Sequence, residues 1–430
     1  MSNRLRIVAD YSKHRISLDE IDIDTYISTD NLLQNKQGKV NAVKMPTQTV
    51  NNVTRFDKGD ILIGNIRPYL KKIWLANYTG GSSSDVLTLK IKENFNSTFV
   101  YYSLFRDDFF EHMMNGSKGT KMPRGDKTQV LDFTIPDFSI NRQKQIAKVL
   151  SDLDAKIELN NKINQELEAM AKTLYDYWFV QFDFPAPSSS SGQAWKPYKS
   201  SGGQMVFNEE LKRVIPVGWE VKKIKEIAKT GSGSTPLKSK KEYYENGNVP
   251  WINSGEVNAS FIISAKKHIS QLGLEKSSAK LFKKGTILMA MYGATAGQVS
   301  LIDLEACTNQ AICGINTNDE KFKYYTKFSL EDLYQYLINL STGSARDNLS
   351  QDKIKELNII IPEESLISTF HNKVKSNFDN ILLNLKQNQK LSELRDWLLP
   401  MLMNGQITVG GAEKEMKSLG LVAEGGEEYK

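Results

Sequence analysis

The chain has 430 residues, which exceeds a single domain of roughly 150 residues and predicts two or three units, each with its own core. Its net charge of +6 permits nucleic-acid binding without requiring it, and its two cysteines exclude a disulfide scaffold, which favours a reducing compartment. It lacks a run of about 18 apolar residues and an apolar stretch at its start, so we expect neither a membrane span nor a signal peptide.

The first region, residues 1–139, is predicted to be a strand-rich α/β domain. A polar turn at 54–60 precedes a short apolar strand at 61–63, and residues 86–91 alternate as a half-buried strand does. Residues 99–105 have a helical pattern, and Pro136 closes the region.

The second region, residues 140–183, is predicted to be one long coiled-coil helix. Its seam residues follow one another at spacings of three and four: Leu153, Ile157, Asn160, Asn164, Leu167, Ala171, Leu174 and Trp178. A helix of about 40 residues is roughly 60 Å long. The narrow apolar stripe indicates that this helix lies outside the interior of a small domain.

The rest of the chain repeats this plan. Residues 184–206 are rich in Pro, Ser and Gly and predict a flexible linker. A second α/β domain is expected at 207–362, a second coiled-coil helix at 363–409, and a tail without fixed structure at 410–430. Cys307 and Cys313 are expected to be buried on one face of a single strand.

Both seams contain paired asparagines, which cost stability in a helix pair but fix its register. They are Asn160, Asn164, Asn384 and Asn388. The two helices are joined through a whole domain, so we expect them to pair with each other in antiparallel fashion. The alternative is that each seam pairs with a different protein.

Three separated segments recur at one offset, which is too long for a solenoid repeat. Residues 58–63 recur at 284–289 and residues 127–136 at 353–362, both offset by 226, and residues 26–32 recur at 251–257, offset by 225. The chain therefore contains an internal repeat of two similar domains. Such pseudo-symmetry suits a target or partner that is itself two-fold.

The motifs of catalysis are missing. No phosphate-binding Gly-x-x-x-x-Gly-Lys-Ser/Thr loop is present, and the tetrapeptide with which adenine methyltransferases hold an extruded base is absent. The four histidines are scattered, and no Cys/His cluster suggests zinc. We therefore expect no catalytic residue, no metal ligand and no cofactor bound by this chain.

Polar and basic loops occur at comparable places in both domains. Lys and Arg neutralise phosphates, whereas Arg, Asn and Gln also bond base edges. The candidate DNA-binding residues are Arg67, Tyr69, Lys71, Lys72, Lys118, Lys121, Arg124, Ser232, Thr235, Lys238, Lys240, Lys241, Asn253, Tyr292, Thr295, Gln298, Asn309, Gln310, Arg346 and Asn348.

This plan resembles the specificity subunit of type I restriction–modification systems, over residues 1 to about 409. The segments that carry the resemblance are QKQIAKVLS at 143–151, LYDYWF at 174–179, FKKGTILM at 282–289, YGAT at 292–295, TNQA at 308–311, DNLSQ at 347–351, IP at 361–362 and LLPMLMNG at 398–405. The first domain fits more loosely.

The resemblance implies two target-recognition domains that bind the halves of a bipartite site in double-stranded DNA. The helices would set the spacer and dock two modification subunits, which carry S-adenosylmethionine and methylate adenine. A motor and nuclease subunit, which uses ATP and Mg²⁺, would join for restriction. The resemblance further implies a cytoplasmic protein of a bacterium or archaeon, with no membrane partner.

Two other functions are compatible with parts of the sequence. The long helices alone would permit a protein-interaction scaffold that binds no nucleic acid. A self-contained nuclease or methyltransferase would require carboxylate sites, and adjacent pairs such as Asp107 and Asp108 are more typical of a solvated surface.

Overall fold

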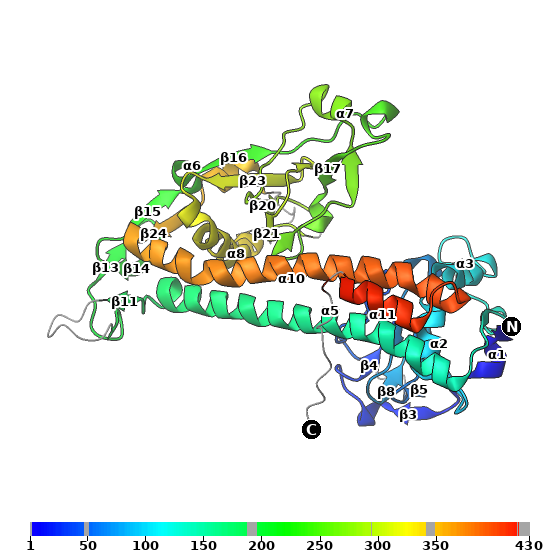
Figure 1. Cartoon of the computed structure of the whole chain (residues 1–430). Coiled ribbons are helices and arrows are strands. Elements are labelled where there is room, and N and C mark those ends of the chain that lie inside the picture. Colours follow the sequence, from blue (N-terminus) through cyan, green and yellow to red (C-terminus); the bar gives the residue numbers. More distant parts are fainter. Residues whose placement is uncertain are drawn as a thin grey trace. The chain divides into compact units, whose positions relative to one another are not determined.

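The computed structural model describes residues 2–46, 51–186, 196–293, 295–340, 349–418 and 420. The chain forms two compact units (Figure 1), of which unit 1 is Met1–Glu158 with Asn388–Lys430 and unit 2 is Leu159–Gln387. The long helices α5 (Ile140–Tyr175) and α10 (Glu364–Asn404) each contribute one half to each unit. Within the described ranges, no helix combines the length and apolarity that crossing a membrane requires.

Unit 1 contains two four-stranded sheets, with strand orders β2-β9-β6-β7 and β3-β5-β8-β4, and the strand pair β1-β10. Its strands are β1 (Ser2–Arg4), β2 (Ala9–Tyr11), β3 (Arg15–Ser17), β4 (Tyr26–Ile27), β5 (Asn52–Phe56), β6 (Ile61–Gly64), β7 (Ile73–Leu75), β8 (Gly80–Ser82), β9 (Val86–Ile91) and β10 (Thr134–Pro136). Its shorter helices are α1 (Leu5–Val8), α2 (Ser97–Leu104), α3 (Asp107–Asn115), α4 (Lys127–Val130) and α11 (Val409–Ser418).

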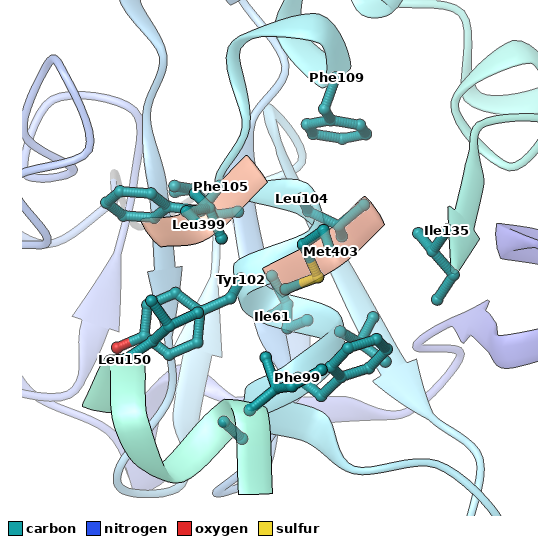
Figure 2. Packing of buried hydrophobic residues seen from close by; sticks show 14 of the residues in the cluster. Ile61, Phe99, Tyr102, Leu104, Phe105, Phe109, Ile135, Leu150, Leu399 and Met403 are labelled. Atoms are coloured by element: carbon teal, nitrogen blue, oxygen red, sulfur yellow. The ribbon is translucent and has the colours of Figure 1, made fainter. Parts of the chain in front are cut away.

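The long helices supply part of the core of unit 1. Leu150 of α5 and Met403 of α10 lie among Ile61 of β6 and Tyr102 of α2 in one buried cluster (Figure 2). The side chain of Ser103 donates a hydrogen bond to Met403 Sδ over 3.6 Å. The expectation that the first of these helices lies outside a domain interior is therefore wrong, because apolar residues off the seam, such as Ala147 and Val149, give α5 a second buried face.

Unit 2 contains a five-stranded sheet of order β16-β23-β20-β21-β18, a three-stranded sheet of order β19-β17-β22, and three strand pairs. Its strands are β11 (Pro185–Ala186), β12 (Lys196–Pro197), β13 (Met205–Asn208), β14 (Arg213–Pro216), β15 (Glu220–Lys223), β16 (Ala228–Ser232), β17 (Val249–Ile252), β18 (Phe261–Ile262), β19 (Lys267–Ile269), β20 (Ile287–Ala290), β21 (Val299–Ile302), β22 (Cys307–Thr308), β23 (Ile312–Thr317) and β24 (Asn358–Ile361). Its shorter helices are α6 (Ile224–Ile227), α7 (Gln271–Glu275), α8 (Lys323–Leu340) and α9 (Gln351–Lys355).

Helix α8 lies between the five-stranded sheet and α10 (Figure 1). Its Tyr324 ring stacks on Phe378 of α10 with centroids 4.4 Å apart, and its Phe328 is buried in the same cluster as Ile287 of β20. Aromatic packing of this kind fixes the α/β domain of unit 2 to its half of the helix pair.

The internal repeat is present in the strand pairing itself. Ile61 pairs with Leu89 in unit 1, and Ile287 pairs with Ile315 in unit 2, both antiparallel and offset by 226 residues. The turns that precede β6 and β20 place Gly59 and Gly285 at φ values of 95° and 86°, a conformation that favours glycine. The mixed fold with an internal repeat is thus confirmed.

The two long helices pair with each other in antiparallel fashion within unit 2. Asn160 Nδ2 donates to Gln387 Oε1 and Asn384 Nδ2 donates to Asn164 Oδ1, each over 2.8 Å. Farther along, Asn377 donates to the Leu167 carbonyl over 3.2 Å. Residue numbers therefore rise along α5 as they fall along α10. That these amides fix the register remains a prediction.

Two segments that the sequence predicts to lack structure are ordered where they are described. In the tail, α11 buries Ala412 and Met416, four residues apart, against the core of unit 1. In the linker, β11 pairs with β12, and Phe184 stacks on Tyr198 with centroids 4.6 Å apart. Both expectations are wrong for these residues, because a few apolar side chains suffice to anchor them. Residues 187–195, 419 and 421–430 lie outside the described ranges.

The two cysteines are buried, as predicted, but on different strands. Cys307 lies on β22 and Cys313 on β23. A turn separates these strands, in which the Ile312 amide donates to the Asn309 carbonyl over 3.3 Å. The prediction of a single strand is wrong because alternation alone does not show this turn.

Candidate nucleic-acid interface

The two predicted basic loops of unit 1 lie side by side. The Arg67 amide donates to the Pro123 carbonyl over 2.7 Å, and the backbones of Lys118 and Arg124 exchange two hydrogen bonds of 3.0 Å. Arg67 and Lys71 adopt left-handed conformations on either side of a short 3₁₀ turn, Pro68–Leu70. We call the resulting side chains the basic surface of unit 1: Arg67, Tyr69, Lys71, Lys118, Lys121 and Arg124.

The cations of this surface are available to a phosphate although some already have acidic neighbours. Lys118 is 84% exposed and lies 3.3 Å from Asp126, and Arg124 lies 3.1 Å from Asp85. Exposed ion pairs of this kind contribute about 0–1 kcal/mol, so a phosphate competes for the same cations. Tyr69, 50% exposed, adds an aromatic ring.

Lys72 does not share this surface. Its ammonium group donates to the Thr29 carbonyl within unit 1, and burial lowers the pKa of Lys72. A cation that donates to a carbonyl of its own unit is not presented to a ligand as the exposed cations are, so Lys72 is not counted in the candidate interface.

A third loop beside the basic surface was missed at the sequence level. The amides of Asn35 and Lys36 donate to the carbonyls of Leu70 and Lys71, each over 2.8 Å, and Lys36 and Lys71 both contact Asp107. The polar run QNKQG at 34–38 marks a turn, and this signal could have located the loop.

Unit 2 has a cavity of about 750 Å³ that brings together six of the predicted residues. We call it the unit 2 pocket. Its lining residues are Thr235, Lys238, Lys241, Tyr244, Glu245, Trp251, Asn253, Lys267, His268, Asn309 and Gln310. The predictions missed Tyr244, Glu245, Trp251, Lys267 and His268, although the basic run 266–268 offered a signal for two of them.

A glycine allows the wall of this pocket to close. A Cβ atom on Gly233 would lie 2.1 Å from Thr308 Oγ1, so only glycine fits there. The next amide, of Ser234, donates to the Thr308 carbonyl over 2.8 Å, and Trp251 Nε1 donates to the Ser234 carbonyl over 3.1 Å. The Gly-rich segment 231–235 is thus held against the β22–β23 turn.

The remaining predicted residues of unit 2 lie elsewhere or are committed to other contacts. Ser232 Oγ donates to Gln351 Oε1 over 2.9 Å, and Thr295 Oγ1 donates to the Ser254 carbonyl over 2.8 Å. Gln298 lines a separate cavity of about 350 Å³. The others are Tyr292, which packs against the core of unit 2, Lys240, which is 3.7 Å from Glu242, and Arg346 and Asn348, which lie outside the described residues.

The same backbone frame holds the equivalent loop in each unit. The amides of Ser83 and Asn309 donate to the carbonyls of Ile27 and Ile252 over 2.8 and 3.0 Å. Two residues later, the carbonyls of Asp85 and Ala311 accept from the amides of Asn65 and Met291 over 2.9 and 2.8 Å. Yet the side chains are Ser-Ser-Asp in unit 1 and Asn-Gln-Ala in unit 2, so one frame presents two different chemistries.

Metal clusters and cysteine thiols are two kinds of reactive site in proteins. In the part of the chain that the structure describes, no set of three or more His, Cys, Asp or Glu side chains could hold a metal ion. Burial raises the pKa of the Cys307 thiol to about 11 and that of Cys313 to about 12, so both thiols are protonated at neutral pH and are poor nucleophiles.

The sequence and the fold are both similar to known proteins. The family model described as the type I restriction modification DNA specificity domain matches residues 17–169 and 216–395. The type I restriction enzyme HindI specificity subunit of Haemophilus influenzae is 29% identical over 437 residues, covering 89% of this chain and 94% of that protein. The MjaIX specificity subunit of Methanocaldococcus jannaschii is 27% identical over 358 residues, covering 82% and 79%. The crystal structure of a type I restriction–modification S subunit from M. genitalium has the same fold, with a TM-score of 0.54, 16% identity, and 94% and 96% of the two chains covered.

Proposed function

The chain belongs to the type I restriction modification DNA specificity family, and from this premise we propose that its two units recognise the two halves of a bipartite DNA site. The observation that carries this proposal is the shared frame with different side chains, Ser83 to Asp85 in unit 1 and Asn309 to Ala311 in unit 2. A common frame places both loops equivalently, whereas different donors and acceptors select different bases. The two half-sites are therefore expected to differ in sequence.

Each unit combines phosphate-binding cations with side chains that bond bases. The basic surface of unit 1 and the lysines of the unit 2 pocket neutralise phosphates and orient the duplex. The amides of the unit 2 pocket, together with Arg124 in unit 1, supply the groups that bond base edges in the major groove. The side-chain chemistry and the positions of these residues support both kinds of contact, to phosphates and to base edges.

We assign the helix pair to partner docking and to the spacing of the half-sites. On α5, Leu159 and Met170 are 51% and 61% exposed and lie with Ile163 along one face, and on α10 Leu383 is 65% exposed. Exposed large apolar side chains on paired helices are typical of an interaction surface. The proposed partners are two modification subunits, which bind S-adenosylmethionine and methylate adenine. A restriction subunit that uses ATP and Mg²⁺ joins them for cleavage.

In this proposal the chain itself contributes recognition and not catalysis. Co-expression with a modification subunit should yield a complex that binds duplex DNA, with an affinity that falls steeply as salt rises. A protein-interaction scaffold would form a complex without salt-dependent DNA binding. A self-contained enzyme would methylate or cut DNA as the isolated chain.

The docking surface has its own test. The double variant Leu159→Ser and Met170→Ser should fold normally but lose co-purification with the modification subunit, because both side chains are already exposed. A matched variant at exposed apolar positions away from the helices, Val206→Ser with Phe207→Ser, should retain it. Equal retention by both variants would contradict the assignment of this face to docking.

A further inference from the structure

The side chains of Asn309 and Gln310, which both line the unit 2 pocket, each accept one hydrogen bond at the carboxamide oxygen. Asn309 Oδ1 accepts from the Ala311 amide over 3.1 Å, and Gln310 Oε1 accepts from the hydroxyl of Thr235. A backbone amide only donates, so the contact with Ala311 fixes which end of the Asn309 carboxamide points inward. The NH₂ group of each side chain is the end that takes no part in these two contacts, and it can donate to a ligand.

The other polar groups around the pocket are mostly donors as well. Lys238, Lys241 and Lys267 line it, and an ammonium group has no acceptor. The acceptors among the lining side chains include Glu245 and the amide of Asn253, whose Nδ2 points to Glu256 Oε1 over 3.5 Å. Among the Lys, Arg, Asp and Glu side chains that line this cavity, three ammonium groups therefore stand against the single carboxylate of Glu245.

We propose that the unit 2 pocket selects guanine, through the NH₂ groups of Asn309 and Gln310. In the major groove, guanine presents N7 and O6, two adjacent acceptors. Adenine adds a donor beside N7, cytosine presents a donor, and thymine presents one acceptor beside a methyl group. This inference rests on the proposed function and extends it from DNA recognition to the base that unit 2 requires.

The equivalent loop of unit 1 differs from the loop of the unit 2 pocket in its hydrogen-bonding groups. The position equivalent to Gln310 is Ser84, and the next residue, Asp85, pairs with Arg124 over 3.1 Å. A carboxylate is an acceptor, so the equivalent loop of unit 1 does not have the same donor-rich character. Changes in the unit 2 pocket should therefore alter one half-site and leave the other as it was.

The test uses two isosteric substitutions, Asn309→Asp and Gln310→Glu, in the complex of the full chain with its modification subunit. Each retains the oxygen that accepts from Ala311 or Thr235 and replaces the NH₂ donor with a second oxygen. Binding selections from a randomised duplex library, followed by sequencing, report the preferred base at every position of both half-sites.

At one position of one half-site, the preferred base should change in the variants. In the parent complex, we expect the base at this position to be guanine. Each variant should replace this guanine with a base that presents a donor, cytosine or adenine. It should also bind the parent site about 5- to 150-fold more weakly, because the loss of its donor is compounded by an acceptor oxygen that now faces an acceptor of guanine. The other half-site should be unchanged.

Ser239→Asp is the matched control, because Ser239 is exposed, lies between Lys238 and Lys240, and does not line the pocket. Its added charge should weaken binding to all sequences equally and leave the base preferences intact. If Asn309→Asp and Gln310→Glu behave like this control, or if the altered base is not a guanine in the parent, the inference is overturned. If the parent complex enriches no sequence, the proposed function fails instead.

Discussion

Lys327 of α8 is a fully buried cation, and its removal should destabilise unit 2 more than the loss of an exposed ion pair would. Its ammonium lies 2.6 Å from Glu331 and 3.7 Å from Glu168 of α5. Burial raises the pKa of Glu331, and the nearby charge of Lys327 offsets part of this increase. Lys327→Met preserves the volume of the side chain but leaves the carboxylate of Glu331 without its counter-charge.

We expect Lys327→Met to lower the free energy of unfolding of unit 2 by about 3 kcal/mol. Breaking a buried pair costs roughly 3–5 kcal/mol, and the lower end applies because Glu331 and Glu168 keep 29% and 40% of their side-chain exposure. Adding Glu331→Gln should restore stability to within about 1 kcal/mol of the parent, because it removes the uncompensated charge.

Urea unfolding of the full chain, followed by tryptophan fluorescence, measures this cycle. A single variant that costs less than about 1 kcal/mol would refute the reasoning. So would a double variant that is less stable than Lys327→Met alone.

The stability deficit of Lys327→Met should also depend on pH. A carboxyl whose pKa is raised by folding destabilises the native state when it is ionised. Its contribution is most favourable below the unfolded value near 4.5 and is lost as pH rises through the folded value. The deficit of Lys327→Met relative to the parent should therefore shrink between pH 7 and pH 5. A deficit that is constant or grows over this range would contradict the assignment to Glu331.

Three further predictions concern other parts of the chain. Arg395→Met in unit 1 should cost about 2–3 kcal/mol in urea unfolding, because Asp154, 2.6 Å away, loses its cation, whereas Asp396→Asn at an exposed site should cost under about 0.5 kcal/mol. Gly233→Ala should weaken DNA binding and lower stability because its Cβ has no room, whereas Gly255→Ala, with open space around it, should do neither. Lys118→Gln should reduce the slope of log affinity against log salt by about 0.9 if that lysine neutralises one phosphate.

The parts of the fold that could be predicted from sequence are those with a local or repeating signal. The seam spacings located α5 and α10, and the recurrence of 58–63 at 284–289 located equivalent strands β6 and β20. The spacing of apolar residues depends only on nearby residues, and the repeat appears when the chain is compared with itself. One sequence is therefore enough to show both.

The composition of the unit 2 pocket could be predicted only in part, because non-local pairing assembles it. His268 reaches the pocket since β17 pairs with β19, with Pro250 opposite His268. The local sequence does not predict that β17 and β19 pair in this register. Lys72 shows the converse, since its residue type suggests phosphate binding and only the fold shows that it contacts the Thr29 carbonyl.

The second buried face of the long helices also could not be predicted from the sequence. The seam residues were visible, but the second apolar face of each long helix became meaningful only when the domain that covers it was in place. In the same way, Ala412 and Met416 look unremarkable in a Gly- and Glu-rich tail until the core of unit 1 is there to bury them.

The central claim, that this chain determines which DNA sequence its partners act on, is tested most directly by mapping methylated adenines. DNA would be sequenced from cells that express the modification subunit with and without this chain. We expect methylation at one asymmetric sequence of two blocks separated by a fixed number of unspecified base pairs, and only when the chain is present. Methylation that is independent of the chain, or confined to a single continuous block, would contradict the account.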